Sequence, residues 1–530
     1  MKRLPLPLLA PLALALATGA VACGAEAAEW DLAQMGRYEQ SEESHSSTPL
    51  SSSGQFTDLR PGDWAYQALS QLIERQGCVA GYADGSLKGG QGITRFEAAA
   101  LIQACLDHSS ERSEEHKKLM AEFEREFALL RGRVDGLEAN VGELGVTTFA
   151  TTTKLLGEAT FVLGANAFSG SAGDWLRESR ADFGATTLSY DAELSFATSF
   201  HGKDRLVTTL RAGNFALSSF GGAGPTSLSQ LEVSFQEDCG PGIDCGDTVA
   251  IDHIFYQFPI GDFLFSIGGR IGQEEMVALW PSVYPSETVL DVLTLAGAPA
   301  AYNKNLGAGA GISWQKNGMA VSANYVAANG DEGDPEVGGI ATAAAAGTGT
   351  VQIGYSNSRW GVAAIASSIE NGNDIIAYGT NFTLQSYGNP GTTTALGLSG
   401  FWQPAPSGWL PSISAGWGLN HSRYRGVSND TGLVATSQSW SVGLEWQDVF
   451  TSGHAMGMAV GQPPFATRLE GGAPANDGNF VGEWWTKFQL TDNIAITPAF
   501  FYLSRPLGGD TPSGKSFRQL GALVKTSLNF

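Results

Sequence analysis

Histidine, serine and cysteine are the residues whose spacing could support catalysis or metal binding, and their arrangement here favours neither. The 530-residue chain has seven histidines, of which His253, His421 and His454 are far apart in the sequence. There is no His-Glu-x-x-His motif, no dinucleotide-binding fingerprint, and no Gly-x-Ser-x-Gly elbow between a strand and a helix. Catalysis requires a fixed set of acid, base or nucleophilic groups. We therefore predict no enzyme, no cofactor and no metal site.

The net charge of the chain argues against binding to nucleic acid. The chain has 31 Lys and Arg against 53 Asp and Glu, a formal net charge of -22. Such a surface repels phosphates, so nucleic acid is not an expected partner. The acidic excess continues through residues 146–530, where we count 18 basic and 32 acidic residues. It indicates either a solvated acidic surface or an internal field that favours cations.

The first residues have the pattern of an export signal. Lys2 and Arg3 precede an apolar stretch over residues 4–22, and small residues then provide cleavage sites. We favour cleavage after Ala28, with lipid attachment at Cys23 as the weaker alternative. Residues 29–55, rich in Ser and Glu, are expected to form a flexible linker.

Export permits disulfide bonds. Cys239 and Cys245 are close enough in sequence to close a small loop, and Cys78 could pair with Cys105. A metal site at Cys239 and Cys245 is the rival interpretation, but no further Cys or His stands near them to complete it.

A small helical domain is expected over residues 56–107. Apolar residues recur at helical spacing over residues 64–73, and Thr94 with Glu97 fits a capping box. The segments that resemble the S-layer homology (SLH) domain are Phe56–Leu59, Trp64-Ala65, Gly77–Gly85 and Ile93–Glu97.

The SLH resemblance implies binding to cell-wall polysaccharide attached to peptidoglycan. It implies that Arg95 pairs with an acidic group of the glycan and that Trp64, Asp84 and Gly85 help to line the pocket. A guanidinium group suits this task because its planar fork matches a carboxylate. The alternatives are that Trp64 belongs to the domain core and that Arg95 faces solvent at a helix N-terminus.

A seven-residue repeat follows over residues 108–145. From Met120 to Leu144 its a and d positions are all apolar, namely Met120, Phe123, Phe127, Leu130, Val134, Leu137, Val141 and Leu144. A strict seven-residue repeat is typical of a coiled coil, because an ordinary amphipathic helix drifts away from it. Residues 133–138 also resemble a motif of parallel trimeric coiled coils. We predict a homotrimer, with a single helix packed on the SLH unit as the alternative.

From residue 146 onward the apolar period changes from seven to two. The clearest alternating segments are residues 351–355, 413–419 and 440–446, each with one apolar face and one face of small or polar residues. Residues 520–530 alternate in the same way and end on Phe530, which resembles the C-terminal signal of bacterial outer-membrane barrels. At 20–25 residues per strand and connection, residues 146–530 provide about 16 strands.

The sequence therefore predicts an all-β transmembrane barrel of about 16 antiparallel strands, preceded by a small α-helical SLH domain and a trimeric coiled coil. Lys154–Glu158 and Asp252–Pro259 resemble cyanobacterial SLH-containing porins, which are grouped with the OprB carbohydrate-selective porins and include iron-uptake porins. This resemblance implies an outer-membrane porin for small hydrophilic solutes and ions, with the SLH domain and coiled coil in the periplasm. The alternatives are a selective channel for carbohydrate or iron species and a mainly structural tether to peptidoglycan.

Residues 271–300 are the candidate for a loop that folds into the pore. Arg270 precedes them on a strand face that we expect to point inward. The acidic residues expected to face Arg270 across the pore are Glu274, Glu275, Glu287 and Asp291. Opposed charges would place a transverse field across the constriction. The alternative is an extracellular loop whose acids face water.

Overall fold

The computed structural model describes residues 152–530 except 238–244, 286–288, 373–374, 405–408 and 450. The expected signal peptide, linker, SLH domain and coiled coil lie outside the described residues. The same holds for every site residue predicted in them, and for Cys239 and Glu287.

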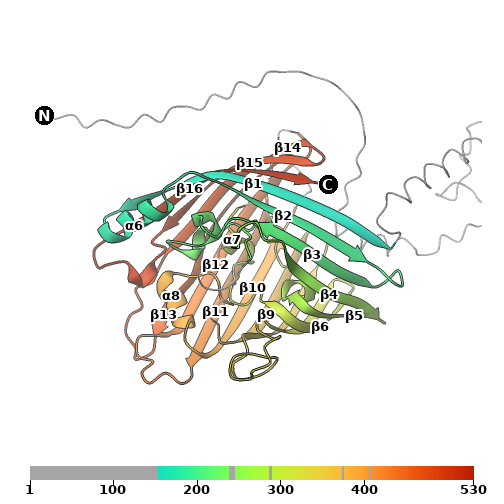
Figure 1. Cartoon of the computed structure of the whole chain (residues 1–530), viewed down its shortest axis with the longest axis horizontal. Helices are drawn as coiled ribbons and strands as arrows, with labels where there is room; N and C mark the ends of the chain where they lie inside the picture. The colour runs from blue at the N-terminus through green and yellow to red at the C-terminus, as the bar shows by residue number, and fades with distance from the viewer. Residues whose placement is uncertain (1–151, 238–244, 286–288, 373–374, 405–408, 450) are drawn as a thin grey trace, which may run out of the picture. The chain divides into compact units, whose positions relative to one another are not determined.

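Sixteen strands form a closed barrel in which each strand pairs with its neighbours in the chain and β1 pairs with β16 (Figure 1). Every pairing is antiparallel, which confirms the predicted fold class and strand number. The strands are β1 (Thr153–Gly170), β2 (Thr187–Thr198), β3 (Arg205–Gly213), β4 (Ala250–Ile260), β5 (Phe263–Gly272), β6 (Leu306–Lys316), β7 (Met319–Ala327), β8 (Gly347–Ser356), β9 (Trp360–Glu370), β10 (Gly391–Trp402), β11 (Ser412–Tyr424), β12 (Val434–Gln447), β13 (Ala455–Leu469), β14 (Phe480–Thr491), β15 (Ile494–Ser504) and β16 (Phe517–Asn529).

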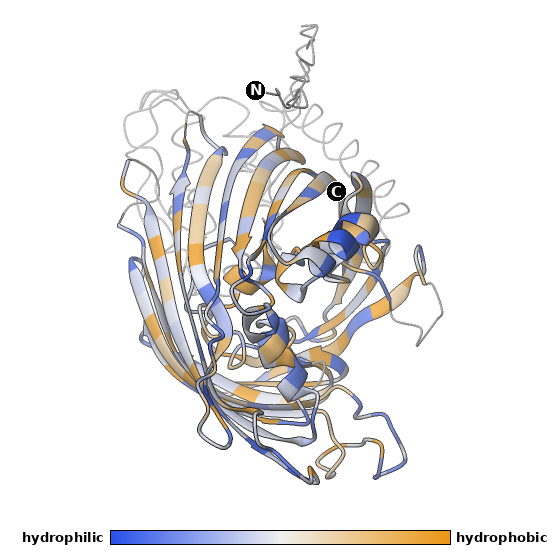
Figure 2. Ribbon diagram, turned by 90° about the vertical axis from the view of Figure 1, so that its left-hand side faces the viewer, coloured by the Kyte–Doolittle hydropathy of each residue, from blue (hydrophilic) through white to orange (hydrophobic). Residues whose placement is uncertain are grey.

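Side chains alternate between the two faces of the wall, as the period of two predicts. On β16, Leu520 and Val524 are exposed on the outside, whereas their neighbours Gln519 and Lys525 are buried on the inside. Figure 2 shows the resulting alternation of hydrophobic and hydrophilic residues along the strands. The outer face is thus apolar and the inner face polar, as a bilayer requires.

The connections at the two ends of the barrel differ in length. The end where β1 begins and β16 finishes has short turns, such as Asn317-Gly318 between β6 and β7. Both residues have positive φ (53° and 82°), as the Asn-Gly pair of a two-residue hairpin requires. The opposite end has the long loops, which contain the short helices α6 (Gly173–Phe183), η1 (Ser219–Gly221), η2 (Ser227–Ser229), η3 (Glu274–Met276), α7 (Asp291–Thr294), α8 (Asn381–Tyr387) and η4 (Gly508–Asp510).

Two long loops fold into the barrel: L2 (residues 214–249) and L3 (residues 273–305). They meet through a β-bridge between Leu231 and Leu290. Both leucines belong to an apolar cluster with side chains from the inner wall of β13–β16, among them Trp485 and Phe501. The structure therefore places L3 inside the barrel, which removes the alternative of an outward-facing loop.

The inner wall of β9–β12 is built to receive the backbone of L3. Ser399 donates to the carbonyl of Ala296 (2.7 Å) and Ser439 to that of Gly297 (3.0 Å). A Cβ on Gly416 would collide with the carbonyl oxygen of Ala296. The small residues that alternate along these strands therefore make room for a packed loop, where the sequence alone suggested an aqueous lumen.

Candidate functional site

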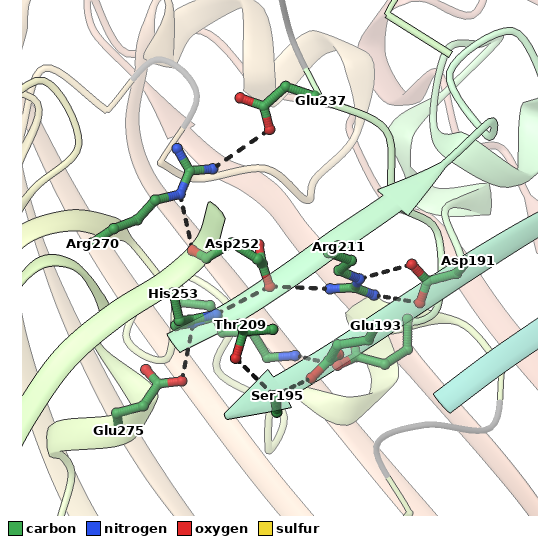
Figure 3. A network of polar contacts seen from close by, with 12 residues as sticks. Asp191, Glu193, Ser195, Thr209, Arg211, Glu237, Asp252, His253, Arg270 and Glu275 are labelled. Carbon is green, nitrogen blue, oxygen red and sulfur yellow. Dashed lines mark hydrogen bonds and ion pairs between the residues drawn. The ribbon is translucent and has the colours of Figure 1, made fainter. Parts of the chain in front are cut away.

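The strands β2–β5 direct charged side chains into the barrel (Figure 3). We call them the inner-wall network, which comprises Asp191, Glu193, Arg211, Glu237, Asp252, His253, Arg270 and Glu275. Glu237 comes from L2 and Glu275 from L3; the other six lie on the four strands.

A β-bulge explains the density of charge on β4. The register between β3 and β4 shifts after Thr209, and that between β4 and β5 shifts after Ile254. A bulge places an additional residue on one strand and re-aims the neighbouring side chains. As a result the consecutive residues Asp252 and His253 contact each other inside the barrel, with 3.0 Å between His253 Nδ1 and Asp252 Oδ2.

Arg211 is the central cation of the network. Its guanidinium donates two hydrogen bonds to the carboxylate of Asp191, at 2.8 and 2.9 Å, and a third nitrogen lies 3.6 Å from Asp252. The aromatic ring of Phe235 covers the guanidinium at 4.9 Å. This bidentate pair fixes the arginine, because two parallel bonds and a stacked ring leave its planar head little freedom.

The network continues from the wall into L3. His253 Nε2 lies 3.2 Å from the carboxylate of Glu275, and the backbone carbonyl of Glu275 accepts a hydrogen bond from Gln257 on β4 (2.9 Å). Glu275 therefore ties the start of L3 to β4 through both its side-chain carboxylate and its backbone carbonyl. His253 joins an acid of the wall to an acid of the loop.

Arg270 does not have the partners that we predicted for it. It donates to the backbone carbonyl of Asp252 (2.9 Å) and its head lies 3.9 Å from Glu237 of L2. Glu275 is held by His253 instead, so the expected opposition of Arg270 to the first acids of L3 is wrong. The physical reason is the β5–β6 register shift between Gly268 and Ile271, which turns Ile271 into a buried apolar cluster.

Asp291 belongs to a separate ion-pair group. Lys304 lies 3.1 Å from its carboxylate and 2.7 Å from that of Glu232 in L2. This lysine therefore links the end of L3 to both α7 and L2. Asp291 therefore has a cation of its own, and its opposition to Arg270 across the pore stays a prediction.

Glu274, also in L3, forms no ion pair with a basic side chain among the described residues. Its Oε2 atom is buried and has no hydrogen-bond partner among the described residues. Burial, with the neighbouring charge of Glu275, raises the pKa of Glu274 to about 7.

On the far side of the barrel, one carboxylate fastens the middle of L3. Glu483 on β14 accepts hydrogen bonds from the hydroxyl of Tyr284 (2.5 Å) and from the backbone N–H of Leu290 (2.8 Å). Trp485 donates its indole N–H to the same tyrosine oxygen (2.7 Å). We call these contacts the L3 anchor. Sequence reasoning missed it, because it joins residues about 200 positions apart.

The remaining predicted groups are accounted for as follows. Cys245 forms a disulfide. His421 donates to the carbonyl of Ala435 and His454 contacts Thr451, so neither joins the network.

In the described part of the chain no three His, Cys, Asp or Glu side chains lie together as metal ligands would. Of the helices in residues 152–530, none combines the length and the apolarity needed to pass through a bilayer.

A phosphate-binding sequence pattern is also present, in the wrong structural context. Residues 509–516 read Gly-Asp-Thr-Pro-Ser-Gly-Lys-Ser, which fits the spacing of a nucleotide-binding loop. That motif needs a strand before it and a helix after it. Here the segment joins the antiparallel strands β15 and β16, so we assign it no nucleotide.

Two family models match this chain. The S-layer homology domain matches residues 55–99, and the carbohydrate-selective porin, OprB family, matches residues 111–519. Both agree with the resemblances seen in the sequence. The SLH match includes Trp64, Asp84, Gly85 and Arg95.

The chain is also similar to individual proteins. An uncharacterized protein of Nostoc sp. is 29% identical over 516 residues, which cover 89% of this chain and 85% of that protein. The outer membrane protein SlpA of Deinococcus radiodurans is 35% identical over 95 residues, 16% of this chain and 8% of that protein. Among solved structures, Pseudomonas putida OprB covers 72% of this chain and 94% of its own at 11% identity, with a TM-score of 0.43.

Proposed function

Because the chain belongs to the carbohydrate-selective porin, OprB family, we propose that its barrel is a passive outer-membrane pore for small hydrophilic solutes and inorganic ions that prefers cations. The carrying observation is the composition of the inner-wall network. It contains five carboxylates (Asp191, Glu193, Glu237, Asp252 and Glu275), against two guanidinium groups (Arg211 and Arg270) and the imidazole of His253.

The position of the network supports this selectivity. L3 is fastened to β14 through its anchor and to β4 through Glu275, so the inner-wall network lies beside the loop that narrows the passage through the barrel. Two members of the network are partly exposed, with 39% of the Arg270 side chain on β5 and 24% of the Glu237 side chain in L2 accessible. An excess of fixed negative charge in such a passage raises the local concentration of cations.

Reversal potentials in planar bilayers test the proposal. Wild-type channels are expected to prefer cations, and Glu193→Gln with Glu237→Gln to reduce the preference. These acids suit the test because neither forms an ion pair shorter than 3.9 Å in the described part of the chain. The matched control is Asp331→Asn on the exposed loop between β7 and β8, which should change nothing. Anion preference of the wild type would contradict the proposal.

A channel selective for carbohydrate or for iron species is the second candidate, and the carbohydrate in the family's description favours it. The same recordings separate the two. A selective channel shows current block that rises with the concentration of its solute. A general pore does not.

We further propose that the SLH segment anchors the barrel to peptidoglycan-linked polysaccharide and that the heptad segment makes the protein a trimer. The SLH match at residues 55–99 supports the first point, and the apolar seam from Met120 to Leu144 the second. A parallel trimer brings three SLH units together, and linked sites gain avidity through effective concentration.

Sedimentation of the full-length protein with peptidoglycan sacculi tests both parts. Arg95→Ala should abolish co-sedimentation. Leu130→Asp with Leu137→Asp should weaken it although Arg95 remains. If breaking the seam leaves binding unchanged, avidity does not explain the anchoring.

A further inference from the structure

One sector of the outer wall, on β10–β13, has basic and hydroxyl side chains side by side at its long-loop end. Strand register places Thr394, His421, Thr436 and Arg468 side by side across β10–β13, through the pairs Thr394–His421, His421–Thr436 and Thr436–Arg468. All four face outward, because the residues beside them, such as Asn420 and Ser437, are buried and bonded inside the barrel. We call these four residues, together with Arg423 two positions farther along β11, the basic row.

The height of the basic row corresponds to a membrane interface. Trp446, an outward residue at the short-turn end of β12, lies ten positions from Thr436. Ten residues span about 33 Å along a strand, and a tilt of about 40° reduces this to about 25 Å across the membrane. That is about the height of the apolar band of an outer-membrane barrel. The row therefore lies at the level of the lipid head groups on the long-loop side.

Outward aromatic residues occupy the long-loop end elsewhere on the barrel, for example Tyr325 on β7 and Tyr502 on β15. Aromatic rings at this level form the usual interfacial girdle. On β10–β13 hydroxyl, imidazole and guanidinium groups replace them, which indicates a polar contact in this sector.

Among the described residues no ion pair involves Arg423, Arg468 or the exposed Arg425 that follows β11. Arg468 contacts the hydroxyl of Thr436 at 3.5 Å, within its own row. The acidic residue in register with Arg423 is Glu370, two strands away through Thr392.

We propose that the basic row binds the phosphate groups of a phosphorylated glycolipid in the outer leaflet of the membrane. Guanidinium groups bind phosphate through two parallel hydrogen bonds, and threonine hydroxyls can donate further ones. Charge complementarity selects this occupant, because a lipid head group brings an anion to arginines that form no ion pair among the described residues. The proposal rests on the placement of the barrel in the outer membrane, not on its selectivity.

The test measures glycolipid phosphate retained per barrel by full-length protein purified from outer membranes and washed with detergent. Arg423→Gln and Arg468→Gln should each lower retention about 5-fold, and together about 25-fold, as expected for a basic side chain at an anionic membrane surface. The matched control is Arg518→Gln, an exposed outward arginine at the long-loop end of β16, which should retain the wild-type amount.

Adding lipid back distinguishes the sources of phosphate. Intact glycolipid should bind the stripped wild-type barrel, whereas dephosphorylated glycolipid and inorganic phosphate alone should not. Equal retention by wild type and the double variant would overturn the proposal. So would tight binding of inorganic phosphate alone. Loss of the oligomer in the double variant with unchanged lipid would assign the row to contacts between copies instead.

Discussion

The inner walls of β2–β5 and of β13–β16 face the same lumen but differ in the polarity of their side chains. On β2–β5 many inward side chains are charged and joined by ion pairs, some of them buried, such as Asp191 and Asp252, and others partly exposed, such as Arg270. On β13–β16 they are apolar and buried, as Val481, Trp485 and Phe501 are under L2 and L3. One wall therefore meets solute and the other holds the loops. Because the apolar wall holds L2 and L3 in place, these loops form a fixed constriction inside a wide barrel.

The comparison predicts that the two walls respond differently to mutation. Changes on the apolar wall should lower the free energy of unfolding and loosen L3. Changes on the charged wall should alter ion selectivity and leave the fold intact.

The largest effect is expected for Trp485→Ala. The side chain is fully buried and donates to the tyrosine of the L3 anchor. Removing a buried tryptophan costs about 3–5 kcal/mol through the cavity that it leaves. Urea unfolding of the barrel in lipid vesicles measures this change. Glu193→Gln on the charged wall should remain within about 0.5 kcal/mol of wild type; equal losses for both variants would refute the division between the walls.

A smaller effect is expected for Glu483→Ala. The substitution leaves the Tyr284 hydroxyl and the Leu290 N–H without their acceptor, at about 1–3 kcal/mol for each buried donor. L3 should then fluctuate, which single-channel recording detects as increased open-channel noise. Tyr284→Phe is the companion variant: it removes the tyrosine's bond to Glu483 and its acceptor role for Trp485, and it keeps the bond from the Leu290 N–H to Glu483. It should show a weaker change of the same kind, and quiet channels in both variants would disprove the anchor.

The sequence was sufficient for the barrel because strand period and turn chemistry are local. Alternation on β8, β11, β12 and β16, and the Asn-Gly turn at Asn317, predicted the wall and its two faces. Arg211 could have been found in the same way, because it shares the inward face of β3 with Val207 and Thr209.

The pairing of charges was not predictable, because it depends on β-bulges and on loop contacts. The bulge at Asp252-His253 and the register shift after Gly268 decide which acids meet Arg270. Similarly, the small inward residues of β9–β12 were interpreted as facing water. They contact L3, and no local pattern reveals a neighbour about a hundred residues away.

The smallest predicted effect concerns pH and comes from Glu274, which lies in η3 at the start of L3. Burial raises its pKa above the ordinary glutamate value to about 7, so the carboxyl keeps its proton near pH 6 and loses it near pH 8. Raising the pH through this window adds one negative charge beside the inner-wall network. At about 8 Å in water one charge contributes about 0.5 kcal/mol, or about a twofold increase in the preference for cations. Reversal potentials measured at pH 6 and pH 8 should show this rise in the wild type and not in Glu274→Gln, whose amide cannot ionise. A rise that persists in the variant would place the titrating group elsewhere in the pore. A fall on going to pH 8 would mean that loss of positive charge outweighs the ionisation of Glu274.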